Sequence, residues 1–199
     1  HMAGLPQLLK QCHVPVYTRA GTMRELVNRK NLDTKAFCVL TKNNFTIGDL
    51  QIETFRTSHD AADPMGLSCY NGKHKLTFMT DTGLVDDTML KNMDESDLLV
   101  LEANYDPQML KYGPYPFDLK KRVAGPYGHL SNEHAAQALL MMKRPEHLQA
   151  VMAHRSEKNN EQAVVIDTVT TALTAEGLIM KQDITIFHGQ PKEMVTIRA

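Results

Sequence analysis

The sequence of 199 residues has no tryptophan, few cysteines and almost no net charge. Cys12, Cys38 and Cys69 are odd in number and far apart, which predicts reduced, mostly buried thiols of a cytoplasmic protein instead of a disulfide framework. A formal charge of -1 argues against a strongly basic protein that coats nucleic acid, but allows an enzyme that binds it through a local patch. No apolar run approaches the roughly 20 residues that cross a bilayer, and no signal peptide is recognisable, so no membrane contact is expected.

Hydrophobic periodicity predicts one domain over residues 1–199, of the α/β (α+β) class. Hairpins are expected early in the chain, with Asn71-Gly72 as the strongest turn signal, and strands alternate with helices later. The expected strands cover 14–17, 97–103, 148–154, 183–188 and 193–199, with hairpins at 45–57 and 66–80. The expected helices cover 5–12, 21–31, 84–96, two short stretches within 107–123, 131–142 and 159–177. This order predicts a layered domain with sheets inside and helices outside.

Four stretches place a possible metal ligand beside a predicted strand end or helix start. They are TSHDAADPMG with His59, FMTDTG with Asp81, GPYGHLSNEH with His129 and VMAHRSEKNN with His154. Histidine nitrogen and carboxylate oxygen together suit Zn²⁺ or Mn²⁺, and the lack of cysteine in these motifs argues against a thiolate site. Each motif alone is weak evidence, because a single histidine at a strand end is more often solvated and TDTG can be a simple turn.

In this order the motifs resemble those of the metallo-β-lactamase fold superfamily, and within it the YycJ/WalJ group of hydrolases, which is related to RNase Z. SHDA with the following proline and glycine resembles the third metal motif of that group, TDTG the fourth and AHRSEKNN the fifth. The middle segment, from ANYD to GHLSN, resembles a stretch that is characteristic of the group. The similarity runs along the whole chain and implies a metallo-β-lactamase-type αβ/βα sandwich.

The resemblance also implies a hydrolase with two divalent metal ions, zinc or manganese. His59 would be a terminal ligand of one ion, Asp81 would bridge both, and His154 would bind the second. His129 matches a position that in RNase Z-like enzymes holds a proton donor and no ligand, so His129 and Asp81 are the expected catalytic residues. Two cations about 3.5–4 Å apart can hold both reacting oxygens of a phosphodiester and generate hydroxide near neutral pH.

The first residues, HMAGL, continue the register of the superfamily signature H-x-H-x-D-H. The resemblance therefore implies that His1 is the closing metal ligand of a motif whose other members are absent from this chain. The alternative, that His-Met remains from expression cloning, stays open. The first strands of the sandwich would also be absent, so an N-terminally incomplete fold is expected, and activity of this stretch alone is in question.

Several further residues are candidates for substrate contacts. Asp60 could orient His59 or a substrate, or simply cap its loop. Asn104 and Tyr105 follow a predicted buried strand, and the resemblance implies that they face the substrate. Ser131 and Asn132 begin a predicted helix, which they could cap, and the helix start could also favour a phosphate group.

A short basic run, Lys120 to Arg122, lies near Tyr112, Tyr115 and Tyr127. Arg122 and its neighbours could hold phosphates while the tyrosines stack on bases. A run of charges is more often a solvated helix face, and this alternative is favoured for at least two of the three residues.

The function implied is a phosphodiesterase or exonuclease-like nuclease that acts on DNA or RNA. Two alternatives stay open: a thioesterase or lactonase on the same scaffold, and a non-catalytic regulatory protein with an incomplete metal site. Because one fold hosts many chemistries, the fold alone does not decide among them. A compact enzyme of this kind could form a homodimer to build its substrate groove.

Overall fold

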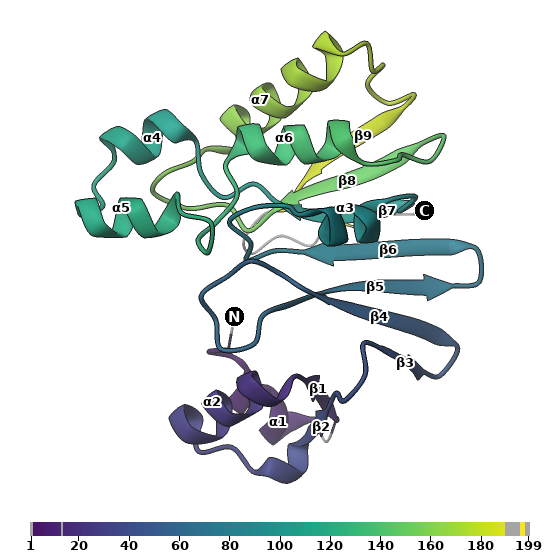
Figure 1. Ribbon diagram of the computed structural model, residues 1–199, viewed down its shortest axis with the longest axis vertical. Coiled ribbons are helices and arrows are strands. Elements are labelled where there is room, and N and C mark those ends of the chain that lie inside the picture. Colours follow the sequence, from purple (N-terminus) through teal and green to yellow (C-terminus); the bar gives the residue numbers. More distant parts are fainter. Residues whose placement is uncertain (1, 13, 190–195, 198–199) are drawn as a thin grey trace.

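The computed structural model describes residues 2–12, 14–189 and 196–197. Within these ranges the main feature is a mixed sheet of seven strands in the order β3-β4-β5-β6-β7-β8-β9 (Figure 1). Neighbouring strands are antiparallel from β3 to β6 and parallel from β6 to β9. The strands are β3 (Asn44–Ile47), β4 (Leu50–Arg56), β5 (Met65–Asn71), β6 (His74–Met79), β7 (Leu98–Glu102), β8 (Leu148–Ala153) and β9 (Ile184–His188).

Both predicted hairpins are present, and a glycine determines each turn. Gly48 and Gly72 have φ angles of 57° and 62°, and each is the first residue between two paired strands. This position in a tight hairpin turn requires a positive φ, which glycine adopts without steric cost. The predicted turn at Asn71-Gly72 is displaced by one residue, because Asn71 pairs with His74 and still belongs to β5.

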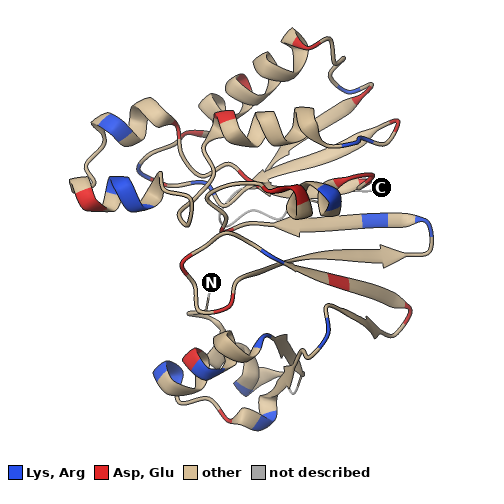
Figure 2. Cartoon of the chain, in the orientation of Figure 1, with Lys and Arg blue, Asp and Glu red and all other residues tan. Residues whose placement is uncertain are grey.

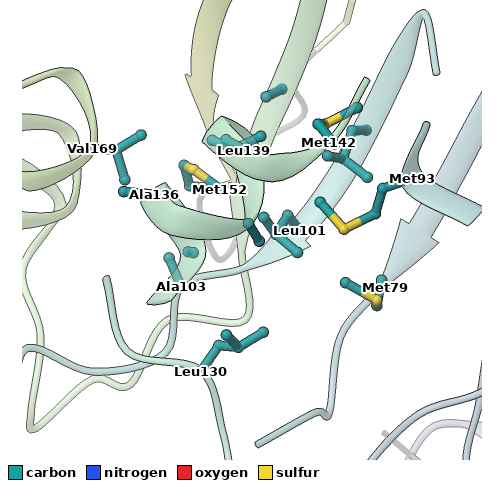
Figure 3. Close-up of a cluster of buried hydrophobic side chains, with 14 of the residues drawn as sticks. Met79, Met93, Leu101, Ala103, Leu130, Ala136, Leu139, Met142, Met152 and Val169 are labelled. Carbon is teal, nitrogen blue, oxygen red and sulfur yellow. The ribbon is translucent and has the colours of Figure 1, made fainter. Parts of the chain in front are cut away.

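Three helices pack on one face of this sheet. They are α3 (Asp87–Met93), α6 (Asn132–Met141) and α7 (Gln162–Ala175). Their apolar side chains meet those of β6, β7 and β8 in one buried cluster (Figure 3), which includes Met79, Met93, Leu101, Leu139, Met152 and Val169. The central strands are therefore anchored in one core, and the loops that carry the site leave from their carboxyl ends.

The remaining elements either precede the seven-stranded sheet in the chain or lie between β7 and α6. At the N-terminal end, β1 pairs in parallel with β2, and α4 and α5 follow β7 (Figure 1). These elements are α1 (Leu5–Gln11), β1 (Val16–Thr18), α2 (Ala20–Lys30), η1 (Thr34–Ala36), β2 (Phe37–Val39), α4 (Pro107–Tyr112) and α5 (Phe117–Val123). The periodicity misses β2, a strand of only three residues. The strand expected at 193–199 lies largely outside the described residues.

The cysteine prediction is right on one point and wrong on another. All three thiols are free, but Cys12 and Cys38 are exposed and Cys69 is half-buried. Cys12 follows α1, and Cys38 lies in the short strand β2, so neither side chain reaches the core cluster. Among the described residues, no helix combines the length and the apolar composition needed to cross a membrane.

Truncating Leu101 to alanine should lower the free energy of unfolding by about 2–5 kcal/mol, because the side chain is fully buried in β7 and its loss leaves a cavity. Urea unfolding measures this difference. Leu8→Ala is the matched control, since Leu8 is 47% exposed on α1 and its truncation should cost about 1 kcal/mol or less. Equal losses in the two variants would contradict the described core.

Candidate metal centre

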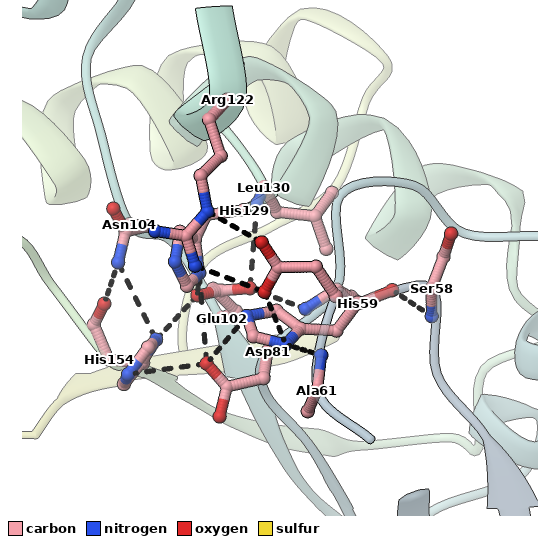
Figure 4. Close-up of polar contacts among 12 residues, drawn as sticks. Ser58, His59, Ala61, Asp81, Glu102, Asn104, Arg122, His129, Leu130 and His154 are labelled. Carbon is pink, nitrogen blue, oxygen red and sulfur yellow. Dashed lines mark hydrogen bonds and ion pairs between the residues drawn. The ribbon is translucent and has the colours of Figure 1, made fainter. Parts of the chain in front are cut away.

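Five acidic and histidine side chains meet at one edge of the sheet (Figure 4). Asp81 follows β6, Glu102 ends β7, His154 directly follows β8, His59 follows β4, and His129 precedes α6. Strands β6, β7 and β8 are parallel, and β4 has the same direction because two antiparallel pairings separate it from β6. The carboxyl ends of all four strands therefore share one edge, as the sequence predicts for the four motifs.

The backbone is strained at two of these positions. Asp81 and His154 have φ angles of 54° and 55°, in the left-handed region that residues other than glycine seldom adopt. Such a conformation costs on the order of 1 kcal/mol and persists where neighbouring groups enforce it. Here Asn104 Nδ2 donates to the carbonyl of His154 at 2.6 Å, and the amide of Thr82 donates to Glu102 Oε2 at 2.9 Å. The strain turns both side chains towards the same point.

Glu102 is fully buried and connects two of the histidines through its carboxylate. Its Oε1 accepts from His129 Nδ1 at 2.8 Å and from His154 Nδ1 at 2.5 Å. Burial alone would raise the pKa of this carboxyl, but the hydrogen bonds from the two imidazoles and from the Thr82 amide outweigh burial and lower the pKa below its ordinary value. An ionised carboxylate only accepts hydrogen bonds, so the Nδ1 atoms of His129 and His154 both carry protons.

The Asp81 carboxylate faces the Nε2 atoms of two histidines through its Oδ1 atom. It is 3.6 Å from His59 Nε2 and 3.6 Å from His154 Nε2. Burial opposes protonation of His154, but the hydrogen bond and charge of Glu102 and the charge of Asp81 raise the pKa of its imidazole above the ordinary value. The amide of Ala61 donates to His59 Nδ1 at 3.0 Å, which turns Nε2 of that ring towards Asp81.

This donor set fits a divalent cation. Two ligands held about 2.0–2.1 Å from one tetrahedral zinc ion lie roughly 3.3–3.5 Å apart. The separations of 3.6 Å around Asp81 Oδ1 are close to that value and too long for hydrogen bonds. A carboxylate that orients the far nitrogen of a histidine, as Glu102 does for His154, is also typical of metal sites. Ligand atoms of Asp81, Glu102, His129 and His154 all lie within 4.8 Å of one another.

A pocket of about 420 Å³ opens in front of the three histidines. Among the residues predicted to contact substrate, Asp60, Asn104 and Arg122 line it. Asp60 and Arg122 are joined by two hydrogen bonds, from Nε to Oδ2 at 2.5 Å and from Nη2 to Oδ1 at 3.1 Å. The hydrogen bond from Arg122 lowers the pKa of the Asp60 carboxyl. Arg155 and Lys158 also line the pocket, although neither is among the substrate contacts predicted from the sequence.

Three predicted substrate contacts do not reach this pocket. Tyr105 is 5% exposed and packs against Leu110 and Val123. Ser131 caps α6 by accepting from the amide of His134, which is the structural alternative left open above. Asn132 is fully buried and exchanges two amide hydrogen bonds with Asn160, at 3.0 and 2.8 Å.

Glu102 is absent from the predicted site, although its sequence carries a signal: a single charged residue ends the otherwise apolar strand LLVLE. The predicted ligand His1 lies outside the described residues.

Comparison with known proteins identifies the family of the chain. Residues 1–154 match the family model of the beta-lactamase superfamily domain. The chain belongs to the beta-lactamase superfamily. This superfamily member is 33% identical over 195 residues to the protein named exodeoxyribonuclease YycJ of Bacillus anthracis, covering 96% of this chain and 74% of that protein. It is 29% identical over 196 residues to the protein named exodeoxyribonuclease WalJ of Streptococcus pneumoniae. This match covers 96% of this chain and 72% of that protein. The resemblance inferred from the motifs is confirmed.

Solved structures of other superfamily members share the fold. The metallo-beta-lactamase fold protein YhfI from Bacillus subtilis superposes with a TM-score of 0.63 at 15% identity, covering 94% of this chain and 69% of that one. The short form of human tRNase Z superposes with a TM-score of 0.55 at 20% identity, covering 79% and 68%. The predicted metallo-β-lactamase-type α/β class is therefore confirmed.

Proposed function

We propose that this superfamily member is a metal-dependent phosphodiesterase that cleaves nucleic acid. One observation carries the proposal: the Asp81 carboxylate faces the Nε2 atoms of His59 and His154 at 3.6 Å, and a third imidazole, His129, lies beside them on Glu102. The relatives named exodeoxyribonuclease support nucleic acid as the substrate, and exonuclease-like cleavage of DNA as the first activity to test.

In this proposal His59, Asp81 and His154 would hold two divalent cations, with Asp81 as the ligand that they share. The resemblance implies that His1 would be a further ligand, from a motif whose other members are absent from this chain. Zinc or manganese bound there would supply a hydroxide near neutral pH and stabilise charge on the phosphodiester oxygens. Asn104 fixes the backbone of His154, and Glu102 fixes its ring, so the ligands are oriented before a cation binds.

His129 is proposed to give a proton to the leaving oxygen. The Nδ1 atom of His129 is hydrogen-bonded to Glu102, so Nε2 is the nitrogen that would exchange a proton with the substrate. Arg122 and Lys158 line the same pocket and attract the phosphate groups. A cytoplasmic location fits the free thiols, and a homodimer remains a prediction from the sequence.

Replacing His129 with alanine should lower kcat/KM for phosphodiester cleavage by about 10²–10⁴-fold while bound metal is retained, because general acid catalysis contributes this much. Hydrolysis of bis-p-nitrophenyl phosphate and of labelled DNA and RNA strands gives the rates, and elemental analysis gives the metal content. His134→Ala is the matched control, from the same sequence stretch but on the exposed side of α6.

Unchanged turnover of the His129 variant would exclude the proton-donor role. Absence of bound metal in the unaltered protein would instead favour a regulatory function. Hydrolysis of thioesters or lactones without hydrolysis of phosphodiesters would assign the scaffold to the other reaction class.

A further inference from the structure

Three aromatic side chains are unusually exposed beside the metal pocket. Tyr112 at the end of α4 is 76% exposed, Phe117 at the start of α5 is 72% exposed, and Tyr127 in the loop after α5 is 65% exposed. Together with Met141, they are the most exposed large hydrophobic side chains among the described residues. We call Tyr112, Phe117 and Tyr127 the aromatic ledge. Exposed apolar side chains that gather on one surface often mark an interaction site, whereas single ones need no explanation.

Cations accompany the ledge. Lys111 Nζ lies 5.2 Å from the ring centroid of Tyr112, and Lys121 Nζ lies 5.5 Å from that of Phe117. Lys120 Nζ donates to the carbonyl of Lys111 at 2.7 Å and so ties α5 to α4. Figure 2 shows bands of Lys and Arg on both helices. Residues 107–127 contain four cationic side chains, of which Arg122 is paired with Asp60, and a single carboxylate, whereas the whole chain has a formal charge of -1.

The ledge continues into the metal pocket. Tyr127 and Arg122 line that pocket, and so does Tyr115, which lies between α4 and α5. The opposite side of the two helices is anchored, because Leu110 and Val123 are buried against Tyr105. Figure 1 shows both helices beyond the end of the central strands. The rings are therefore held on a rigid support next to the proposed reaction centre.

Exposed rings with adjacent ammonium groups match one kind of partner. A nucleic-acid strand offers flat bases that stack on aromatic rings and phosphates that pair with cations. Only unpaired bases present their faces, since a duplex covers them by stacking. We infer that the ledge is a stacking surface for unpaired bases of a nucleic-acid strand whose end enters the metal pocket. This inference rests on the proposed function, and it names the part of the substrate that the ledge binds.

The double variant Tyr112→Ala/Phe117→Ala should bind a single strand at least about tenfold more weakly, since each base stacked on an aromatic ring contributes substantially. The measurement is fluorescence anisotropy of a labelled phosphorothioate strand, which resists cleavage, with the metal-loaded protein. Met141→Ala, at a similar exposure on α6, is the matched control and should bind as the unaltered protein does. An abasic strand of the same length should bind the unaltered protein about as weakly as the intact strand binds the double variant.

Several results would overturn the inference. They are full affinity in the double variant, equal affinity for intact and abasic strands, and equal affinity for single strand and blunt duplex. A change in the oligomeric state of the double variant without a loss of strand binding would assign the ledge to a protein contact. Phe117→Leu, which keeps an apolar side chain but no ring, should also weaken binding. Failure of the unaltered protein to hydrolyse bis-p-nitrophenyl phosphate, with strand binding intact, would instead count against the proposed function.

Discussion

Replacing Asp81 with asparagine should remove bound divalent metal and lower phosphodiester hydrolysis by roughly a thousandfold, because metal ions contribute several kcal/mol to transition-state stabilisation. Asp81 Oδ1 is the atom that faces both His59 and His154 at 3.6 Å. A neutral amide cannot hold two cations together as a carboxylate does. Elemental analysis measures the metal per chain, and hydrolysis of bis-p-nitrophenyl phosphate measures the rate.

Asparagine is the informative replacement because of the backbone at this position. Asp81 has a φ of 54°, and asparagine tolerates the left-handed region better than alanine does. The variant therefore keeps its fold, and its midpoint of thermal unfolding in the absence of metal should match that of the unaltered protein. Asp87→Asn, in the first turn of α3, controls for the loss of one negative charge. Two bound ions and normal turnover in the Asp81 variant would refute the bridging role.

The sequence predicts the superfamily and the edge of the sheet where the site lies. The superfamily comes from the resemblance of the motifs SHDA, TDTG, GHLSN and AHRSEKNN to those of known members. The position of the site comes from a local signal, an apolar strand followed by a polar residue, repeated after β4, β6 and β8. The structure places these strands in one sheet with their carboxyl ends at one edge, so His59, Asp81 and His154 come together there. The roles of these residues stay predictions until metal binding is measured.

What the sequence does not reveal is the direction of side chains in the loops. Tyr105 lies in the loop after β7 and points into a buried contact, and periodicity is undefined outside regular elements. The first residue of α6, Asn132, also points into a buried contact, and a helix start is too short to show periodicity. Pairs between distant segments are equally hidden, as with Asp60 and Arg122, which lie 62 positions apart. The burial of Glu102 is hidden in the sequence for a related reason. A charged residue at a strand end is normally expected to face solvent.

Replacing Glu102 with glutamine should reduce both stability and metal affinity. The carboxylate accepts hydrogen bonds from His129, His154 and the amides of Thr82 and Leu130. A glutamine offers one acceptor oxygen and places an NH₂ group against the remaining donors. Each buried donor left without a partner costs about 1–3 kcal/mol. Loss of the group that orients a metal-ligating histidine typically weakens metal binding by about 10–100-fold.

Urea unfolding of the metal-free protein and metal titration separate these two effects. Glu95→Gln is the matched control, because Glu95 is an exposed carboxylate and its solvent-screened ion pair with Lys143 contributes little to stability. If Glu102 were itself a metal ligand, its replacement should remove a bound ion altogether, as the Asp81 variant does. If Glu102 orients the two imidazoles, both ions should still bind at high metal concentration. Turnover should then stay low even at saturation, because His129 is no longer held in place.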